Sequence, residues 1–193
     1  RSILILCRKS YIYHMKGDEN NSTWNGLHVG QFENDDLDKL IPLMSQEFKD
    51  WDTNQIKSYL SLAASTKNNF AGALVAKNKA GYYVGVLIYT LQQIDAKYVE
   101  NSKPNKNDNG IDVLVVEHLI ASSLILQKHV FMSLVDSALK VAEKHSCNFV
   151  ELPKFDSKHY ELIQKKYKNQ ISDSTDYRTY LKLNKSTDKQ IVL

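Results

Sequence analysis

The sequence predicts a mixed α/β (α+β) domain in which one central mixed sheet carries helices on both faces. Three observations favour this fold class. Apolar residues recur at helical spacing over 37–48. The apolar, strand-like segment 70–76 and the segment 82–91, which is rich in β-branched and aromatic residues, flank a turn. The long apolar run Ile111–Ala121 suits a central strand that is covered on both faces.

The first half of this domain predicts a strand, two helices and an antiparallel hairpin. Apolar residues mark the strand within 27–32, and residues 34–36 supply capping chemistry for the helix that follows. Pro42 lies inside that helix and should kink or shorten it, because proline lacks a backbone N–H. The second helix is expected to end near Ser65. Lys77–Gly81 then forms the turn of the hairpin.

The second half predicts one central strand followed by two helix–strand pairs. A polar segment over 95–110, expected to be an exposed connection, leads into the central strand. The elements after that strand are, in order, a helix that Ser146 and Cys147 close, a strand over 148–152, a helix capped by Asp156 or Ser157, and a strand over 177–183.

The ends of the chain differ in composition from its middle. Residues 1–26 are expected to be an N-terminal extension and linker, because 16–26 is polar and rich in turn-forming residues. Residues 184–193 are expected to be a polar C-terminal tail. The domain itself should occupy 27–183, and a hydrophobic fraction of 42% is enough for its core.

Composition argues against several classes of function. The formal net charge of +3 is small for this length, whereas nucleic-acid binders carry a stronger, clustered excess, so no nucleic-acid partner is expected. No apolar run approaches the ~18 residues that span a bilayer, so no membrane partner is expected. Cys7 and Cys147 lack metal-ligand spacing and form no disulfide framework. We therefore expect a cytoplasmic protein with two free thiols and no metal site.

Four segments, in this order along the chain, carry a resemblance to a known family. They are LHVGQFENDDLDKLIPLMSQEF (27–48), ALVAKNKAGYYVGVLIY (73–89), SLVDSALKVAEKHSCNFVEL (133–152) and KFDSKHYELIQKKYKNQISDSTDYRTYLKL (154–183). They resemble, respectively, the first strand and helix, the central hairpin, the coenzyme-side helix with its following strand, and the closing helix and strand of the GNAT (N-acetyltransferase) superfamily.

The resemblance covers 27–183 and implies a GNAT-like central mixed sheet with helices on both faces. It implies an acyl-CoA-dependent N-acyltransferase, with acetyl-CoA as the acyl donor and a small-molecule or peptide amine as the acceptor. The resemblance does not decide whether the chain is a monomer or forms a homodimer.

The coenzyme loop of this family is altered here. In the family, an Arg or Gln followed by glycines opens a helix whose backbone N–H groups hold the coenzyme pyrophosphate. The equivalent residues, 126–131, contain no glycine. In one interpretation, the amides of Gln127, Lys128, His129, Val130 and Phe131 still face the phosphates, and two of these side chains add donors and charge. In the other, this is an ordinary helix start that Phe131 obstructs.

The predicted central strand supplies the other candidate site residues. The resemblance places the coenzyme's pantetheine arm against backbone groups of Leu119, Ile120 and Ala121. Glu117 lies two residues before Leu119, so regular alternation would put both side chains on one face. A carboxylate in an apolar strand suits proton abstraction near neutral pH, so Glu117 is the candidate general base. The alternative is a carboxylate that only pairs with a lysine or water. His118 is expected to face the other way and to be structural.

One family residue has no counterpart. The tyrosine that protonates the departing thiolate in the family aligns with Leu162. Tyr160 and Tyr167 lie nearby in sequence, but on a helix they project at other angles and are expected to pack in the core. With the missing glycines, this favours an alternative function, a catalytically inactive GNAT-like binding or regulatory module. The order of the strands and Glu117 favour the enzyme.

Overall fold

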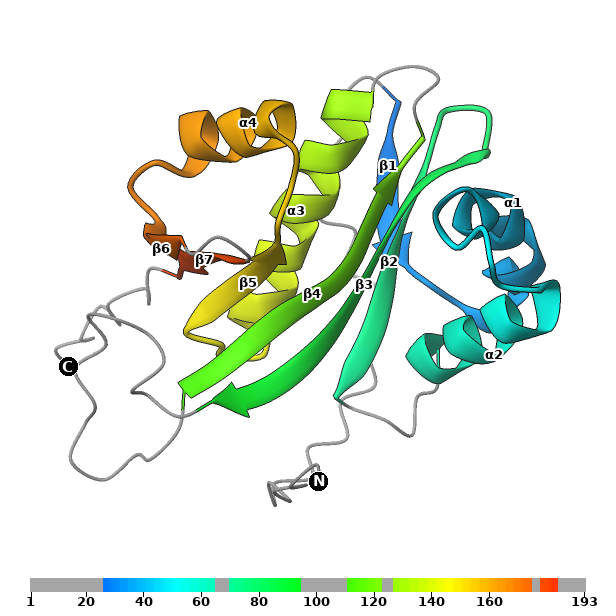
Figure 1. Ribbon diagram of the computed structural model, residues 1–193, viewed down its shortest axis with the longest axis horizontal. Helices are drawn as coiled ribbons and strands as arrows, with labels where there is room; N and C mark the ends of the chain where they lie inside the picture. Colours follow the sequence, from blue (N-terminus) through cyan, green and yellow to red (C-terminus); the bar gives the residue numbers. More distant parts are fainter. Residues whose placement is uncertain (1–25, 65–69, 95–110, 123–126, 175–177, 184–193) are drawn as a thin grey trace, which may run out of the picture.

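The computed structural model describes residues 26–64, 70–94, 111–122, 127–174 and 178–183. Its elements, coloured along the chain in Figure 1, are β1 (His28–Gln31), the 3-10 helix η1 (Asn34–Asp36), α1 (Leu37–Glu47), α2 (Thr53–Ala64), β2 (Ala71–Lys77), β3 (Tyr83–Ile94), β4 (Ile111–Ala121), α3 (Gln127–Lys144), β5 (Phe149–Pro153), α4 (Ser157–Tyr167), β6 (Ile171–Ser174) and β7 (Arg178–Lys182). The expected extension 1–26, apart from Gly26, the connection 95–110 and the tail 184–193 lie outside the described residues, so those assignments stay predictions.

A single mixed sheet forms the centre of the described fold. Its seven strands follow the order β1-β2-β3-β4-β5-β7-β6, in which β4 and β5 are parallel and the other neighbours are antiparallel. The predicted hairpin is β2 and β3, which pair from Ala71 opposite Thr90 to Lys77 opposite Tyr83, with a register shift between Ala76 and Lys77. The strand β6, which the sequence did not predict, is an edge strand of this sheet.

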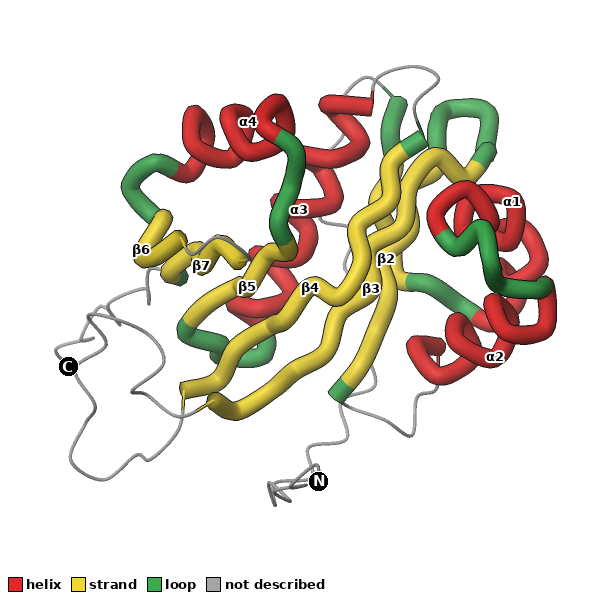
Figure 2. The backbone as a smooth tube through the Cα atoms, viewed as in Figure 1, coloured by secondary structure: helices red, strands yellow, loops and turns green. Residues whose placement is uncertain are grey.

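Helices cover both faces of this sheet, as Figures 1 and 2 show: α1 and α2 on one, α3 and α4 on the other. Alternate residues of β3 divide between the two cores. Val86 and Ile88 pack in the cluster that includes α1 and α2, whereas Leu87 and Tyr89 pack in the cluster that includes α3 and α4. The predicted fold class is therefore confirmed.

The helix limits follow mostly from local chemistry. Pro42 lies inside α1 but does not cut it short, since the helix continues to Glu47. The second helix ends at Ala64, next to the expected Ser65. Asp156 caps α4, because its side chain accepts the backbone N–H of His159.

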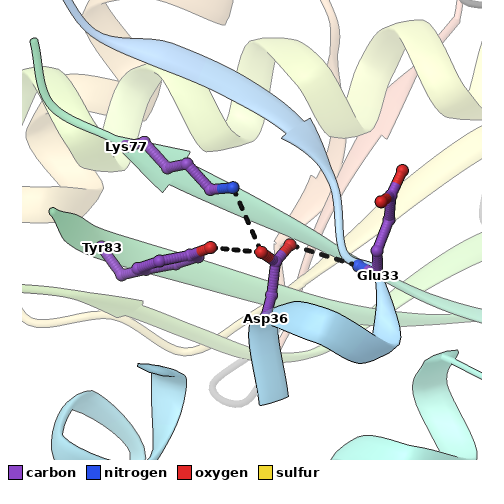
Figure 3. A network of polar contacts seen from close by, with 4 residues as sticks. All are labelled: Glu33, Asp36, Lys77 and Tyr83. Carbon is purple, nitrogen blue, oxygen red and sulfur yellow. Dashed lines mark hydrogen bonds and ion pairs between the residues drawn. The ribbon is translucent and has the colours of Figure 1, made fainter. Parts of the chain in front are cut away.

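A buried carboxylate ties the start of α1 to the end of the hairpin (Figure 3). Asp36 accepts the backbone N–H of Glu33 at 3.3 Å, the Lys77 ammonium at 3.2 Å and the Tyr83 hydroxyl. Burial alone would raise the pKa of Asp36, but the hydrogen bonds from Tyr83, Lys77 and Glu33 outweigh it and hold that pKa below its ordinary value. Because these partners come from β2, β3 and the turn before α1, the network fixes α1 against the sheet.

The parallel strands β4 and β5 separate toward their carboxyl ends. β4 lies between β3 and β5 and is largely buried, as predicted. Its ladder with β5 joins only Val113–Val115 to Phe149–Glu151, yet β4 continues to Ala121. In Figure 1, β4 runs on past the end of β5, which turns toward α4. The predicted divergence of the two strands is confirmed, and it leaves an opening in the sheet.

Candidate active site

A cavity occupies the opening between β4 and β5. Its volume is ≈ 320 Å³, within the range in which proteins hold small ligands. Its lining comes from the end of α1, from β4, from the start of α3 and from the stretch that runs from the end of β5 into the first turn of α4. The residues are Glu47, Glu117, His118, Leu119, Ile120, Ala121, Gln127, Phe131, Pro153, Lys154, Phe155, Asp156 and His159.

A bulge in β4 decides which side chains enter the cavity from each face. The register with β3 shifts so that Ile88 opposes His118 while Tyr89 opposes Val116, which leaves Glu117 as the extra residue. Leu119 packs in the core with α3, whereas His118 contacts the aromatic rings of Phe48, which caps the end of α1, and of Tyr59 in α2. The expectation that Glu117 shares a face with Leu119 and points away from His118 is wrong, because a bulge breaks the regular alternation.

Glu117 is held by its neighbour on β3. The Thr90 hydroxyl donates to Oε1 of Glu117 at 3.0 Å. Burial raises the pKa of Tyr59 to about 12, and the negative charge of Glu117 adds to this effect. The candidate base is therefore a half-buried, oriented carboxylate that borders the cavity from the α1–α2 side.

His118 sits beside Glu117 in an aromatic setting. Its ring makes edge contacts with Phe48 and Tyr59, at centroid distances of 4.8 Å and 5.7 Å. Burial lowers the pKa of His118, although the charges of Glu117 and Glu47 oppose this shift. These contacts agree with the structural role expected for His118. It also borders the cavity, so a neutral imidazole lies next to the candidate base.

The start of α3 is where the resemblance places the coenzyme phosphates. Gln127 opens the helix and borders the cavity, and its side-chain amide lies 3.4 Å from the carbonyl oxygen of Ala121. Val130 is buried and packs in the core, whereas Lys128 and His129 are exposed outside the cavity lining. Of the five residues predicted here, the structure brings only Gln127 and Phe131 to the cavity.

Three rings close the cavity on the α3–α4 side. Phe131 contacts Phe155 edge-on at 4.8 Å and His159 at 4.5 Å between ring centroids. Nδ1 of His159 lies 2.8 Å from the Asp156 carboxylate, the same group that caps α4. Sequence reasoning missed His159. The available signal was a histidine three residues after a helix-capping aspartate, one turn before the vacant tyrosine position.

The vacant tyrosine position is structural here. Leu162 is partly buried and packs against the α3–α4 core. Tyr167 is buried, as predicted, and its hydroxyl donates to Asp136 on α3. Tyr160 is only half-buried and does not border the cavity. Neither tyrosine borders the cavity.

Two further observations limit the chemistry of the described residues. None of their His, Cys, Asp and Glu side chains form a group of three or more that could hold a metal ion. None of their helices is long and apolar enough to cross a membrane. Cys147 is a buried free thiol, and Cys7 lies outside the described residues.

Comparison with known proteins places this fold. No family model matches the chain, and no curated protein matches it. Among solved structures, aminoglycoside N-acetyltransferase AAC(6')-Iy in complex with CoA is 12% identical, with a TM-score of 0.58 over 81% of this chain and 93% of that one. Aminoglycoside 6'-N-acetyltransferase AAC(6')-Ih from Acinetobacter baumannii is 12% identical, with a TM-score of 0.57 over 83% and 99%.

A third similar structure is the ribosomal-protein-alanine N-acetyltransferase from Brucella melitensis. It is 17% identical, with a TM-score of 0.52 over 82% of this chain and 99% of that one. The chain has the fold of the GNAT N-acetyltransferases, and at these identities the likeness establishes the fold alone.

Proposed function

We propose that the chain is an acyl-CoA-dependent N-acyltransferase that moves an acetyl group from acetyl-CoA to an amine. One observation carries this proposal: the cavity at the β4–β5 opening brings together an end of β4, the first turn of α3 and the Glu117 carboxylate. An acyl transfer to an amine needs a place for the thioester and a proton acceptor beside it. Both are provided by residues that border this one cavity.

The end of β4 supports binding of the pantetheine arm. Among the described strands, β4 has a ladder partner on its β5 side only as far as Val115. Backbone groups of Leu119, Ile120 and Ala121 therefore lie beyond the parallel ladder, and all three residues border the cavity. An arm built of amides can supply hydrogen bonds that a neighbouring strand would otherwise make.

The start of α3 supports binding of the phosphates. A helix N-terminus presents unpaired backbone N–H groups and the positive end of the helix dipole. Val130 is buried in the core, the buried Phe131 ring forms part of the cavity wall, and Lys128 is exposed at the same helix end. This arrangement favours the interpretation in which the backbone amides serve the phosphates without the usual glycines.

Glu117 supports the proton transfer that the amine requires. The Thr90 hydroxyl orients its carboxylate, and the lowered pKa of His118 keeps that neighbouring ring neutral near pH 7. Bound acetyl-CoA would supply the activated carbonyl. Glu117 would take the proton that the amine loses, directly or through a water molecule. The acceptor is a small-molecule or peptide amine, and the similar structures are named for an aminoglycoside and for the alanine of a ribosomal protein.

A second candidate function, an inactive GNAT-like binding or regulatory module, is favoured by Leu162. This residue packs against the core at the position where the family has its proton-donating tyrosine. An inactive module can still hold the coenzyme, so binding alone does not separate the two functions.

A transfer assay separates them. The full chain is incubated with acetyl-CoA and two acceptor panels, aminoglycosides and peptides with a free N-terminal alanine. Thiol release is followed with time, and mass spectrometry identifies the acetylated product. The proposal expects acceptor-dependent thiol release together with an acetylated amine. Bound acetyl-CoA that yields no product with any acceptor would favour the inactive module.

A further inference from the structure

His159 is a titratable side chain of the cavity to which the proposed function assigns no role. It lies in the first turn of α4 and borders the cavity from the side opposite Glu117. Two contacts hold its ring, a tilted ring contact with Phe131 at 4.5 Å between centroids and the 2.8 Å contact of Nδ1 with Asp156. These contacts leave Nε2 for a second partner.

From this geometry we propose that His159, held by Asp156, donates a proton to the sulfur of coenzyme A when the acetyl group leaves it. The inference rests on the proposed function and adds a residue to it. It assigns to His159 the task left vacant at Leu162, which is packed in the core. A histidine held by a carboxylate can work as a general acid near neutral pH.

The step balances in atoms and electrons. The amine nitrogen attacks the thioester carbonyl carbon, and a C–N bond forms. The C–S bond then breaks, and its electron pair stays on sulfur. The proton on Nε2 of doubly protonated His159 passes to that sulfur and gives the free thiol. The surplus proton of the amine goes to Glu117, which releases it to solvent, and solvent returns a proton to His159. No atom changes its oxidation state.

The position of His159 between the two proposed parts of the coenzyme site supports this role. The ring contacts Phe131, which lies on the helix turn that Gln127 opens, and it shares the cavity with Leu119 of β4. The other titratable groups that border the cavity are Glu47, Glu117, His118, Lys154 and Asp156. Of these, Glu117 and His118 approach from the α1–α2 side, so base and acid come from opposite faces of the sheet.

Histidine-ring NMR of the full chain tests this inference without any acceptor. The chain has six histidines, and comparison with His159→Gln assigns the signal of His159. The chain is titrated with coenzyme A and, separately, with desulfo-coenzyme A, which lacks only the sulfur. We expect coenzyme A to shift the His159 signal clearly more than the desulfo compound does, while backbone amides at the start of α3 respond to both.

Each other outcome is decisive. If both compounds shift the α3 amides and affect His159 equally, the coenzyme binds and the role of His159 is wrong. If neither compound shifts any signal, the proposed function fails and the inference fails with it.

Kinetics supply the second readout once an acceptor is found. His159→Gln should lower turnover with acetyl-CoA by about 10²–10⁴-fold, the usual cost of losing a general acid. The loss should shrink with an aryl thioester, because its thiolate leaves without needing a proton. Asp156→Asn keeps a good capping residue and removes the charge, so it should act in the same direction on a folded chain. Equal losses with both thioesters would make His159 structural.

Discussion

Gly85 sets how closely α3 approaches the sheet, which makes Gly85→Ala a sharp test of the packing behind the site. A Cβ at this position would lie 2.5 Å from Cγ1 of Val130, 3.0 Å from Cδ1 of Leu134 and 3.2 Å from the carbonyl oxygen of Ile120. Val130 and Leu134 are buried in α3, so neither side chain can move freely away. The new methyl group therefore has to push α3 outward.

The expected cost follows from this overlap. Overpacking of a core costs about 1–3 kcal/mol. For a chain of this length, each kcal/mol lowers the melting temperature by about 2–4 °C. Val130 also lies one turn from Gln127, so a displaced α3 should weaken acetyl-CoA binding as well. Thermal melts followed by circular dichroism, with calorimetry of acetyl-CoA on the same samples, measure both effects.

Gly30→Ala is the matched control. Its Cβ would meet only the His28 ring, at 3.3 Å, and that side chain is exposed and can move. The control should therefore stay within about 0.5 kcal/mol of the parent chain. If Gly85→Ala has the same melting temperature as Gly30→Ala, the close approach of α3 to β3 does not constrain the fold, and the reasoning is refuted. Val130→Ala should relieve part of the cost in the double variant, because it removes the nearest methyl group.

Two further predictions concern carboxylates. Glu117→Gln should lower the rate of acetyl transfer near neutral pH by about 10²–10⁴-fold. The loss should be smaller at high pH, because the acceptor amine is already neutral there. Unchanged turnover in a folded variant would mean that Glu117 has only a structural role. Asp36→Asn should destabilise the chain at pH 7, because it removes the ionised partner of Lys77 and Tyr83. The folded pKa of Asp36 is lowered, so its contribution is present above the ordinary value of 3.8 and is lost as pH falls through the folded pKa. Thermal melts of both chains should converge in acid, and a constant difference would contradict the role of this network.

The elements that could be predicted from the sequence are those whose apolar composition indicates that they are buried. β4 was recognised as central because Ile111–Ala121 is apolar on both faces, as a covered strand must be. β6 was missed because three of its four residues, Ser172, Asp173 and Ser174, are polar and give no strand pattern. An edge strand needs little apolar surface, and only its pairing with β7 defines it.

The candidate site was predicted only where it depends on one segment. Leu119, Ile120 and Ala121 border the cavity because of the position of β4, and their contact with a coenzyme stays a prediction. The bulge at Glu117 was not predicted, since it appears only in the register with β3. His159 was missed for a similar reason, because only the tertiary packing of α4 brings it into contact with α3 and to the cavity that β4 also borders.

Calorimetric titration with acetyl-CoA tests the central claim most directly, when it is carried out on the parent chain and on Ala121→Trp. Ala121 ends β4 and borders the cavity, so an indole at this position should fill the opening between β4 and β5. Ala121→Ser, which keeps the side chain small, is the control, and circular dichroism confirms that each variant is folded. We predict saturable heat for the parent and the serine variant and none for the tryptophan variant. No heat from the parent at millimolar acetyl-CoA, or equal heat from a folded Ala121→Trp chain, would contradict a coenzyme site in this opening.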